Sequence, residues 1–216
     1  MDNCVDYEHD HSFWVHTMTT EWDLVCERVA LKTLAKLILF TGFALGSFAS
    51  GLISDRFGRK TAIWYSSITM VVFGVITSFI PWYPVFVFTW WVTGTMAIAC
   101  YTAAFVWTME LATGKWKIIL GMSMNYSWPF CRLIIAGLAY VLRDWHWHLR
   151  IISAMVAVGA VLLFWVPESP RWLIAKSRTD EAKKILFSAA KRNGKDIKEE
   201  DIVLKVQGVP KNMGIQ

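Results

Sequence analysis

The sequence predicts an all-α membrane protein, and three observations support that fold class. Of its 216 residues, 55% are hydrophobic and 18% are charged, whereas a soluble domain carries about a quarter charged residues. The apolar residues gather in segments about as long as a membrane-spanning helix, which needs roughly 20 of them. Basic residues gather in alternate loops between these segments. The chain therefore indicates a helical bundle in a bilayer rather than a soluble core.

Five apolar segments are the predicted membrane-spanning helices, and together they form a bundle over residues 31–166. The fifth is the weakest, because its purely apolar part, 151–166, has only 16 residues. In the first segment Gly42, Gly46 and Ser50 recur every four residues, so another helix can approach closely there. The five ranges are about 33–53, 61–80, 85–107, 118–142 and 147–166.

The loop charges predict the orientation of the chain, because lysine and arginine in short loops accumulate on the cytoplasmic side. Residues 1–30 hold seven acidic residues and one basic residue, residues 54–60 hold three basic residues, and residues 81–84 hold none. The segment from residue 167 onward holds eleven basic residues. We therefore expect 1–30 to be an extracellular loop remnant and 167–216 to be a cytoplasmic helical segment. Because the basic residues do not share one face, nucleic acid is not an expected partner.

Within that last segment, a short amphipathic helix is predicted to begin near Thr179. Asp180 and Glu181 suit the positive end of a helix dipole, and Asn193–Gly194 is a typical stop. Its apolar residues are small, which favours packing under the membrane domain over binding to lipid.

The stretch GLISDRFGRK, residues 51–60, joins the first two apolar segments. Gly51 and Gly58 suit a backbone bend or a close approach to another helix, and Asp55 can pair with basic groups on a neighbouring helix. A loop selected only for positive charge explains the basic residues but neither the acid nor the two glycines. The pattern resembles the loop between the second and third helices of the major facilitator superfamily.

A second stretch, VPESPRWLIAKSRTDEAKKIL at residues 166–186, is similar to the segment after the sixth helix in the organic cation/carnitine transporter family of that superfamily. Sugar porters share the core from Pro167 to Arg171, but Trp172–Leu173 and the basic helix that follows point to the organic ion branch. The stretches AGLAYVLRDW, residues 136–145, and TEWDLVCERVALKTLAK, residues 20–36, resemble the same branch.

The resemblance covers nearly the whole chain and implies a partial bundle from the amino-terminal half of a twelve-helix carrier. On this alignment the sequence begins inside the large extracellular loop, carries helices two to six and ends in the central cytoplasmic loop. The implied function is transport of small organic ions across the plasma membrane by alternating access, together with the missing carboxy-terminal half. The ions would be organic cations, carnitine-like zwitterions or organic anions. A sugar porter, and a truncated membrane protein that regulates a full-length carrier, remain alternatives.

The resemblance also implies a cytoplasmic charge latch that closes the two halves in the outward-open state. A carrier with two states needs contacts that exist in only one of them, and charge-assisted pairs at helix ends supply such contacts. The family often has arginine where this chain has Lys117, and lysine cannot form arginine's forked bond to a carboxylate. From charge patterning alone, Glu110 could also be a solvated carboxylate at a helix end. The implied set is Asp55, Arg56, Gly58, Arg59, Glu110, Lys117, Glu168 and Arg171.

Three residues are candidates for the substrate cavity. Tyr101 and Phe105 are four apart and share a helix face, which could hold a cation by cation–π attraction or could simply pack. Arg132 lies deep in the segment 118–142, where an arginine costs roughly 2.5–3.5 kcal/mol and usually faces a cavity or a partner. It could bind an anionic or zwitterionic substrate, or it could pair with an acid on a missing helix.

No set of residues predicts catalysis, a cofactor or a metal site. The chain shows no nucleophile–base pair, phosphate-binding loop or dinucleotide fingerprint, so we expect no enzyme activity. The histidines at 9, 11, 16, 146 and 148 lack the spacing of a strong metal site. Cys4 and Cys26 lie on the predicted outside, where disulfides persist, but their pairing is open.

Overall fold

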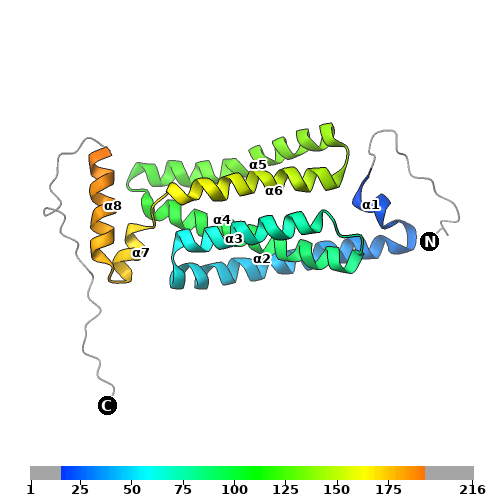
Figure 1. Cartoon of the computed structure of the whole chain (residues 1–216), viewed down its shortest axis with the longest axis horizontal. Helices are drawn as coiled ribbons and strands as arrows, with labels where there is room; N and C mark the ends of the chain where they lie inside the picture. Colours follow the sequence, from blue (N-terminus) through cyan, green and yellow to red (C-terminus); the bar gives the residue numbers. More distant parts are fainter. Residues whose placement is uncertain (1–15, 193–216) are drawn as a thin grey trace, which may run out of the picture.

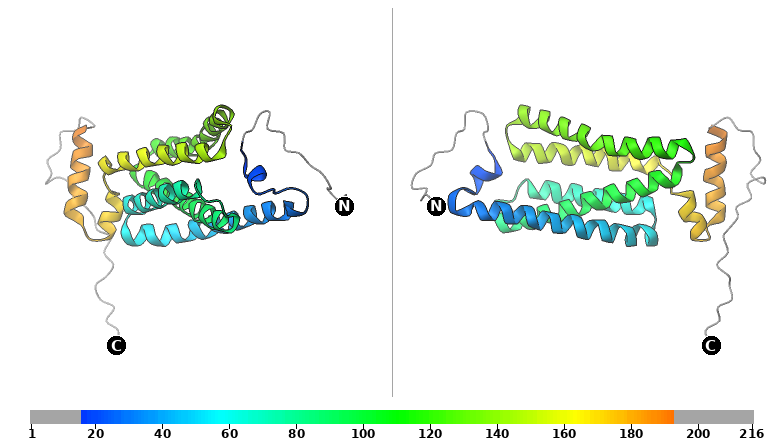
Figure 2. Two further views of the ribbon diagram at one scale, coloured as in Figure 1. Left: turned by 45° about the vertical axis from the view of Figure 1, so that its right-hand side comes forward. Right: turned by 180° about the vertical axis from the view of Figure 1, so that it is seen from behind.

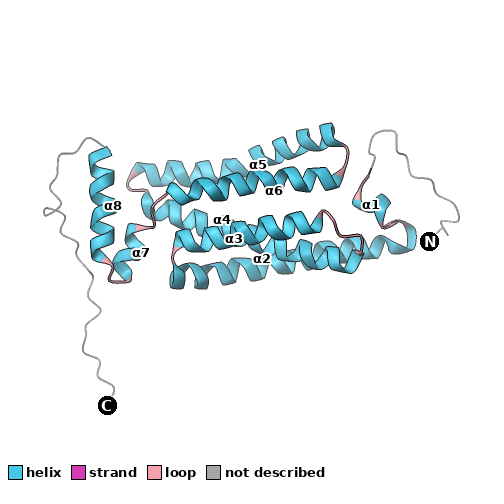
Figure 3. Cartoon of the chain, in the orientation of Figure 1, coloured by secondary structure: helices cyan, strands magenta, loops and turns pink. Residues whose placement is uncertain are grey.

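The computed structural model describes residues 16–192, which form an all-helical bundle (Figures 1 and 3). Within these residues there is no strand, and the β-type pairing is a single bridge between His16 and Asp144. Short 3-10 turns lie at Cys26–Arg28 and Leu163–Trp165. The α-helices are Met18–Glu21 (α1), Val29–Phe57 (α2), Arg59–Thr77 (α3), Tyr83–Leu111 (α4), Lys115–Leu142 (α5), Trp145–Leu162 (α6), Pro170–Ala175 (α7) and Thr179–Arg192 (α8).

The five long helices, α2 to α6, lie along the bundle, and each runs in the opposite direction to the one before it (Figure 1). Helix α4 packs against both α2 and α3, and α3 also packs against α6. Helices α7 and α8 lie at one end of the bundle and α1 lies at the other, as the rotated views confirm (Figure 2). We refer to these as the α7 end and the α1 end. Helix α8 lies across the axes of the long helices (Figures 1 and 2).

Small residues let α2 and α4 pack closely, as the spacing in the sequence indicated. A side-chain Cβ on Gly42 would lie 2.7 Å from Thr95 Oγ1, and one on Gly46 would collide with the Thr95 carbonyl oxygen. One turn further on, Ser50 donates a hydrogen bond to the Ala99 carbonyl at 2.9 Å. These three positions form the contact seam between the two helices.

At the α1 end, aromatic rings and one carboxylate tie α1 to the bundle. Trp22 packs on Phe86 at 4.5 Å between ring centroids, and Trp145 packs on Phe86 at 5.5 Å. Trp145 Nε1 also donates to Glu21 Oε2 at 2.7 Å. His146 lies between two acids, 3.5 Å from Glu21 Oε2 and 3.2 Å from Asp144 Oδ1.

The structure agrees with most of the predicted membrane segments and corrects the expected role of Gly51. Four helical segments are long and apolar enough to cross a membrane: Cys26–Phe57, Arg59–Thr77, Tyr83–Leu111 and Trp145–Trp165. Helix α5 is also long, but Asn125 and Arg132 interrupt its apolar run, and it is not among these four segments. Gly51 was expected to serve a bend or a close approach, but it lies inside α2, and a Cβ there would meet nothing within 4 Å.

Candidate functional site

A largely buried, forked ion pair joins Arg59 and Glu110 at the α7 end. Arg59 Nη2 lies 2.8 Å from Glu110 Oε1, and Nε donates to both carboxylate oxygens at 3.1 and 3.2 Å. The two side chains are only 11% and 17% exposed. Arg59 begins α3 and Glu110 lies in the last turn of α4. The pair therefore joins the ends of two neighbouring helices at the α7 end of the bundle.

The segment between α6 and α7 completes this cluster. Ser169 is fully buried and donates its hydroxyl to Glu110 Oε2 at 2.5 Å. The same hydroxyl caps α7 by accepting from the Trp172 amide at 3.4 Å. Glu110 is thus held from two sides, by a guanidinium and by a hydroxyl. Bonds to a charged group are stronger than bonds between neutral groups.

Glu168 caps the beginning of α3. Its Oε1 accepts a hydrogen bond from the Lys60 amide at 3.0 Å, one of the helix amides that have no partner within the helix. A carboxylate there also complements the positive end of the helix dipole. Gly58 makes room for it, because φ at Gly58 is 105° and a Cβ would lie 2.6 Å from Glu168 Oε2.

Trp172 anchors α7 to the end of α2. Its ring is 9% exposed, and its Nε1 donates to the Asp55 carbonyl oxygen at 3.0 Å. Leu173 and Ala182, both buried, pack beside Trp172 and join α7 to α8. The α6–α7 segment and the two short helices therefore form the lid of the charge cluster.

Trp172→Phe is expected to loosen α7 by about 1 kcal/mol, because it keeps an aromatic ring but removes the indole N–H and its hydrogen bond to Asp55. Hydrogen exchange of the amides at 171–175, followed by mass spectrometry, should accelerate about fivefold. Trp116→Phe is the matched control, because Trp116 is 58% exposed on α5. Equal exchange at 171–175 in the two variants would contradict this anchoring role.

The structure brings five of the eight predicted latch residues together and leaves three apart. Arg59, Glu110, Glu168 and Gly58 form the cluster, and Asp55 joins it through Arg59 Nη1 at 2.8 Å although its side chain is 74% exposed. The exposed group is Arg56, Lys117 and Arg171, which form no ion pair within residues 16–192.

The loop expected at 54–60 is shorter than predicted, and this explains why some predicted latch residues turn inward while others remain exposed. Only Gly58 lies between α2 and α3. Arg56 therefore belongs to the last turn of α2, where its guanidinium lies 5.5 Å from the Phe57 ring centroid. Arg59 belongs to the first turn of α3 and turns inward. Lys117 is exposed near the start of α5, so the family's usual arginine is not needed for the Arg59–Glu110 pair.

Sequence reasoning missed Ser169 and the side chain of Trp172. A signal for Ser169 was available, because serine followed by proline is a typical start of a helix, with proline at the first helical position. Its second bond, to Glu110, has no local signal, since the two residues are 59 positions apart.

The predicted cavity residues lie on one aromatic and basic face formed by α4 and α5. The rings of Tyr101 and Phe105 stack with their centroids 6.5 Å apart, and Trp128 meets Tyr101 edge-on at 6.1 Å. The Arg132 guanidinium lies 5.3 Å from the Trp128 ring centroid. A pocket of about 280 Å³ is lined by Tyr101, Phe105 and Asn125, among others. Arg132 has no carboxylate partner within residues 16–192.

The other sequence expectations concern cysteines and metals. Cys26 is disulfide-bonded, and Cys4 lies outside the described residues, as do the histidines at 9 and 11. In the part of the chain that the structure describes, no three histidine, cysteine or acidic side chains gather as a metal site would require.

The sequence matches the sugar (and other) transporter family over residues 11–212. Similar curated proteins include solute carrier family 22 member 7 of Sus scrofa, 33% identical over 201 residues, which cover 91% of this chain and 36% of the relative. The organic cation/carnitine transporter 2 of Rattus norvegicus is 34% identical over 197 residues, which cover 89% of this chain and 35% of the relative. An organic cation transporter protein of Drosophila melanogaster is 31% identical over 198 residues, which cover 91% of this chain and 36% of the relative. The chain thus spans about a third of the length of these relatives.

Solved structures of a carrier have the same fold. The major facilitator superfamily proton:xylose symporter XylE bound to 6-bromo-6-deoxy-D-glucose superimposes with a TM-score of 0.69 at 20% identity, covering 82% of this chain and 42% of that chain. The inward open conformation of the xylose transporter XylE from E. coli superimposes with a TM-score of 0.63 at 19% identity, covering 74% of this chain and 43% of that chain. The apolar helices of the bundle are those of a multi-pass membrane protein. The chain belongs to the sugar (and other) transporter family.

Proposed function

We propose that this sequence forms the amino-terminal part of a plasma-membrane carrier that moves small organic ions by alternating access. Residues 1–30 lie outside the cell and residues 167–216 lie in the cytoplasm. The substrates are organic cations, carnitine-like zwitterions or organic anions, and they bind between this bundle and the carboxy-terminal half of the carrier, near the bilayer midplane. Transport requires no cofactor and no chemical step.

The observation that carries this proposal is the aromatic and basic face of α4 and α5. Tyr101, Phe105 and Trp128 present rings that attract an organic cation. Arg132 lies beside them and offers a forked donor to a carboxylate. A face with both features suits an ion that carries an apolar body and either sign of charge. The names of the relatives, which include organic cation and carnitine transporters, agree with this chemistry.

The charges at the α7 end have two different roles in this proposal. Arg59, Glu110 and Glu168 hold the ends of α3 and α4 to the lid, because they are satisfied within the bundle. The latch to the other half uses the residues that remain exposed, which are Asp55, Arg56, Lys117 and Arg171. Exposed charges can form pairs in one state of the carrier and release them in the other.

The test is uptake of three labelled ions by cells that express the complete reading frame containing this sequence. The ions are a quaternary ammonium cation, carnitine and an organic carboxylate. Arg132→Gln is expected to raise KM about tenfold or more for the ions that carry a carboxylate, because a charge-assisted bond is lost. Arg132→Lys is the control that keeps the charge, and it should retain most of the affinity.

Three outcomes would count against the proposal. Uptake of xylose with none of the three ions would support a sugar porter, the function named by the structural neighbours at 19–22% identity. Uptake by this 216-residue chain alone in proteoliposomes would show that no second half is needed. Co-purification with a full-length carrier whose rate it changes, without uptake of its own, would support a regulatory protein.

A further inference from the structure

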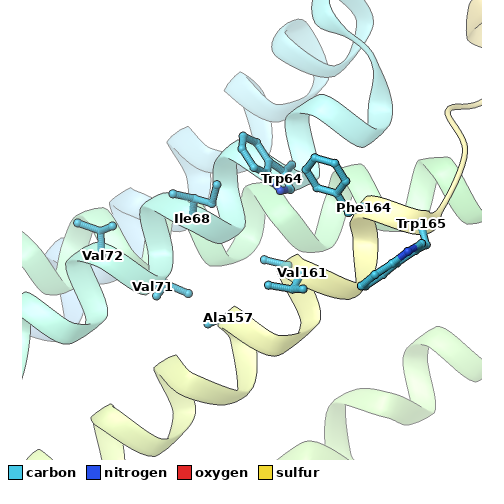
Figure 4. Close-up of a pocket in the computed structure, with 9 residues that line it drawn as sticks. Trp64, Ile68, Val71, Val72, Ala157, Val161, Phe164 and Trp165 are labelled. Carbon is cyan, nitrogen blue, oxygen red and sulfur yellow. The ribbon is translucent and has the colours of Figure 1, made fainter.

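A groove runs between α3 and α6, away from every residue used above for substrate or latch. It has a volume of about 580 Å³, and nine residues line it. Figure 4 draws these residues as sticks, among them Trp64, Ile68 and Val72 along α3, and Ala157, Val161 and Phe164 along α6 and the turn that follows it. Both helices belong to segments that are long and apolar enough to cross a membrane. The groove therefore lies along the part of the bundle that is long and apolar enough to cross the hydrocarbon layer.

The lining suits a flexible hydrocarbon chain better than another helix. All nine lining residues are apolar, and seven of them have large side chains. Helices in membranes pack through small residues that let the backbones approach, as α2 and α4 do at Gly42 and Gly46. Here only Ala157 and Ala160 are small. An acyl chain can adapt its shape to bulky walls, and it needs no polar partner.

A cation lies at the α7 end of the groove. Lys60 is one helical turn before Trp64, and its Nζ donates to the Phe164 carbonyl oxygen at 2.9 Å. The Nζ also lies 5.6 Å from the Phe164 ring centroid. An ammonium has three donors, and no carboxylate pairs with this one within residues 16–192. The bond to Phe164 thus fixes a positive charge at the groove mouth, with donors to spare.

Aromatic side chains surround this mouth at the depth where the bilayer changes from hydrocarbon to headgroup. Phe164 and Trp165 are 70% and 76% exposed at the end of the membrane segment, and Trp64 packs edge-on against Phe164 at 6.2 Å. Tryptophan is enriched at membrane interfaces. The charged mouth therefore lies level with lipid phosphates, while the groove below it lies level with acyl chains.

We propose that the α3–α6 groove is a binding site for an anionic phospholipid. One acyl chain lies along Trp64, Val72 and Val161, and the headgroup phosphate accepts hydrogen bonds from Lys60. Basic pockets between membrane helices bind anionic headgroups by this chemistry. The proposal does not depend on what the carrier transports, since it does not use the α4–α5 face, and Lys60 touches the charge cluster only through its main-chain amide.

The test uses the purified chain in detergent with phospholipids that carry a photoreactive acyl chain, followed by peptide mass spectrometry. Phosphatidylglycerol is the anionic probe and phosphatidylcholine is the neutral one. Phosphatidylglycerol should label the 64–72 and 157–164 peptides about fivefold more than phosphatidylcholine, which is the factor expected from about 1 kcal/mol per basic residue.

Two pairs of variants separate the headgroup from the groove. Lys60→Gln should abolish the preference for phosphatidylglycerol, whereas Lys115→Gln, which removes an exposed lysine of α5, should leave it unchanged. Ala157→Phe fills the groove and should remove labelling by both lipids. Val158→Phe adds the same ring one residue away, on a side chain that is 61% exposed and outside the groove, and should not.

The proposal is overturned if the two lipids label the groove equally, or if Ala157→Phe leaves labelling unchanged. Labelling that is uniform around the helices would indicate bulk lipid only. Cross-links between two chains through the groove peptides would indicate that a second copy occupies it. Lys60→Arg, which keeps the charge and the fold, should retain the lipid preference and thereby rules out misfolding as the cause of any loss.

Discussion

Gly46→Ala is expected to destabilise the bundle by about 1–3 kcal/mol, the cost of forcing an extra methyl group into a close-packed contact. The new Cβ would collide with the Thr95 carbonyl oxygen and would lie 2.6 Å from Ile98 Cγ2. A backbone carbonyl cannot move aside as a flexible side chain can, so α2 and α4 must separate. Unfolding in detergent by denaturant titration, followed by tryptophan fluorescence, would measure the loss.

Gly51→Ala on the same helix is the matched control, and its effect should have the opposite sign. Gly51 lies inside α2, and a Cβ there would meet nothing within 4 Å. Glycine in a helix interior is less favourable than alanine by about 0.5–1 kcal/mol, so this variant should be slightly more stable. If the two variants changed stability alike, the seam between α2 and α4 would not be the close contact described here.

Glu110→Gln is expected to destabilise the α7 end by about 3 kcal/mol, the lower part of the range for removing one partner of a buried ion pair. We expect a cost in the lower part of that range because 17% of the Glu110 side chain remains exposed. The change leaves the Arg59 guanidinium without its main counter-charge and weakens the bond from Ser169. Thermal unfolding in detergent and hydrogen exchange at residues 59–62 and 169–173 would report the loss.

The chain contains its own comparison for this effect, the forked pair between Arg178, which lies just before α8, and Glu181 in the first turn of α8. Its bonds are as short, at 2.8 and 2.7 Å, but both side chains are 52% exposed. Exposed pairs contribute about 0.2–1 kcal/mol, so Glu181→Gln should cost a fraction of what Glu110→Gln costs. Similar losses in the two variants would mean that burial does not set the strength of the Arg59–Glu110 pair.

The composition and the apolar segments were sufficient to predict the fold class, because the bilayer permits few alternatives to a helical bundle. The seam at Gly42, Gly46 and Ser50 could also be predicted from the sequence, since a spacing of four residues is about one helical turn. Helix α5 was harder to judge. Asn125 and Arg132 interrupt its apolar run, and Arg132 has no carboxylate partner within residues 16–192.

The candidate site was only partly predictable, because its members come from distant parts of the chain. Motif resemblance named Arg59, Glu110 and Glu168, but nothing in a motif tells which charges turn inward. The positive φ of Gly58 decides this, since it ends α2 and begins α3 within one residue. As a result Arg56 faces outward while Arg59, three residues later, is buried.

The cap on α3 also sets an order of assembly during synthesis. Glu168, which satisfies the Lys60 amide, lies 108 residues further along the chain. At 5–20 residues per second, the ribosome makes Glu168 about 5–20 seconds after Lys60. During that interval the first turn of α3 must be satisfied by water or by lipid headgroups. The α7 end is therefore closed last, and a nascent chain that stalls before Glu168 is made carries an uncapped start of α3.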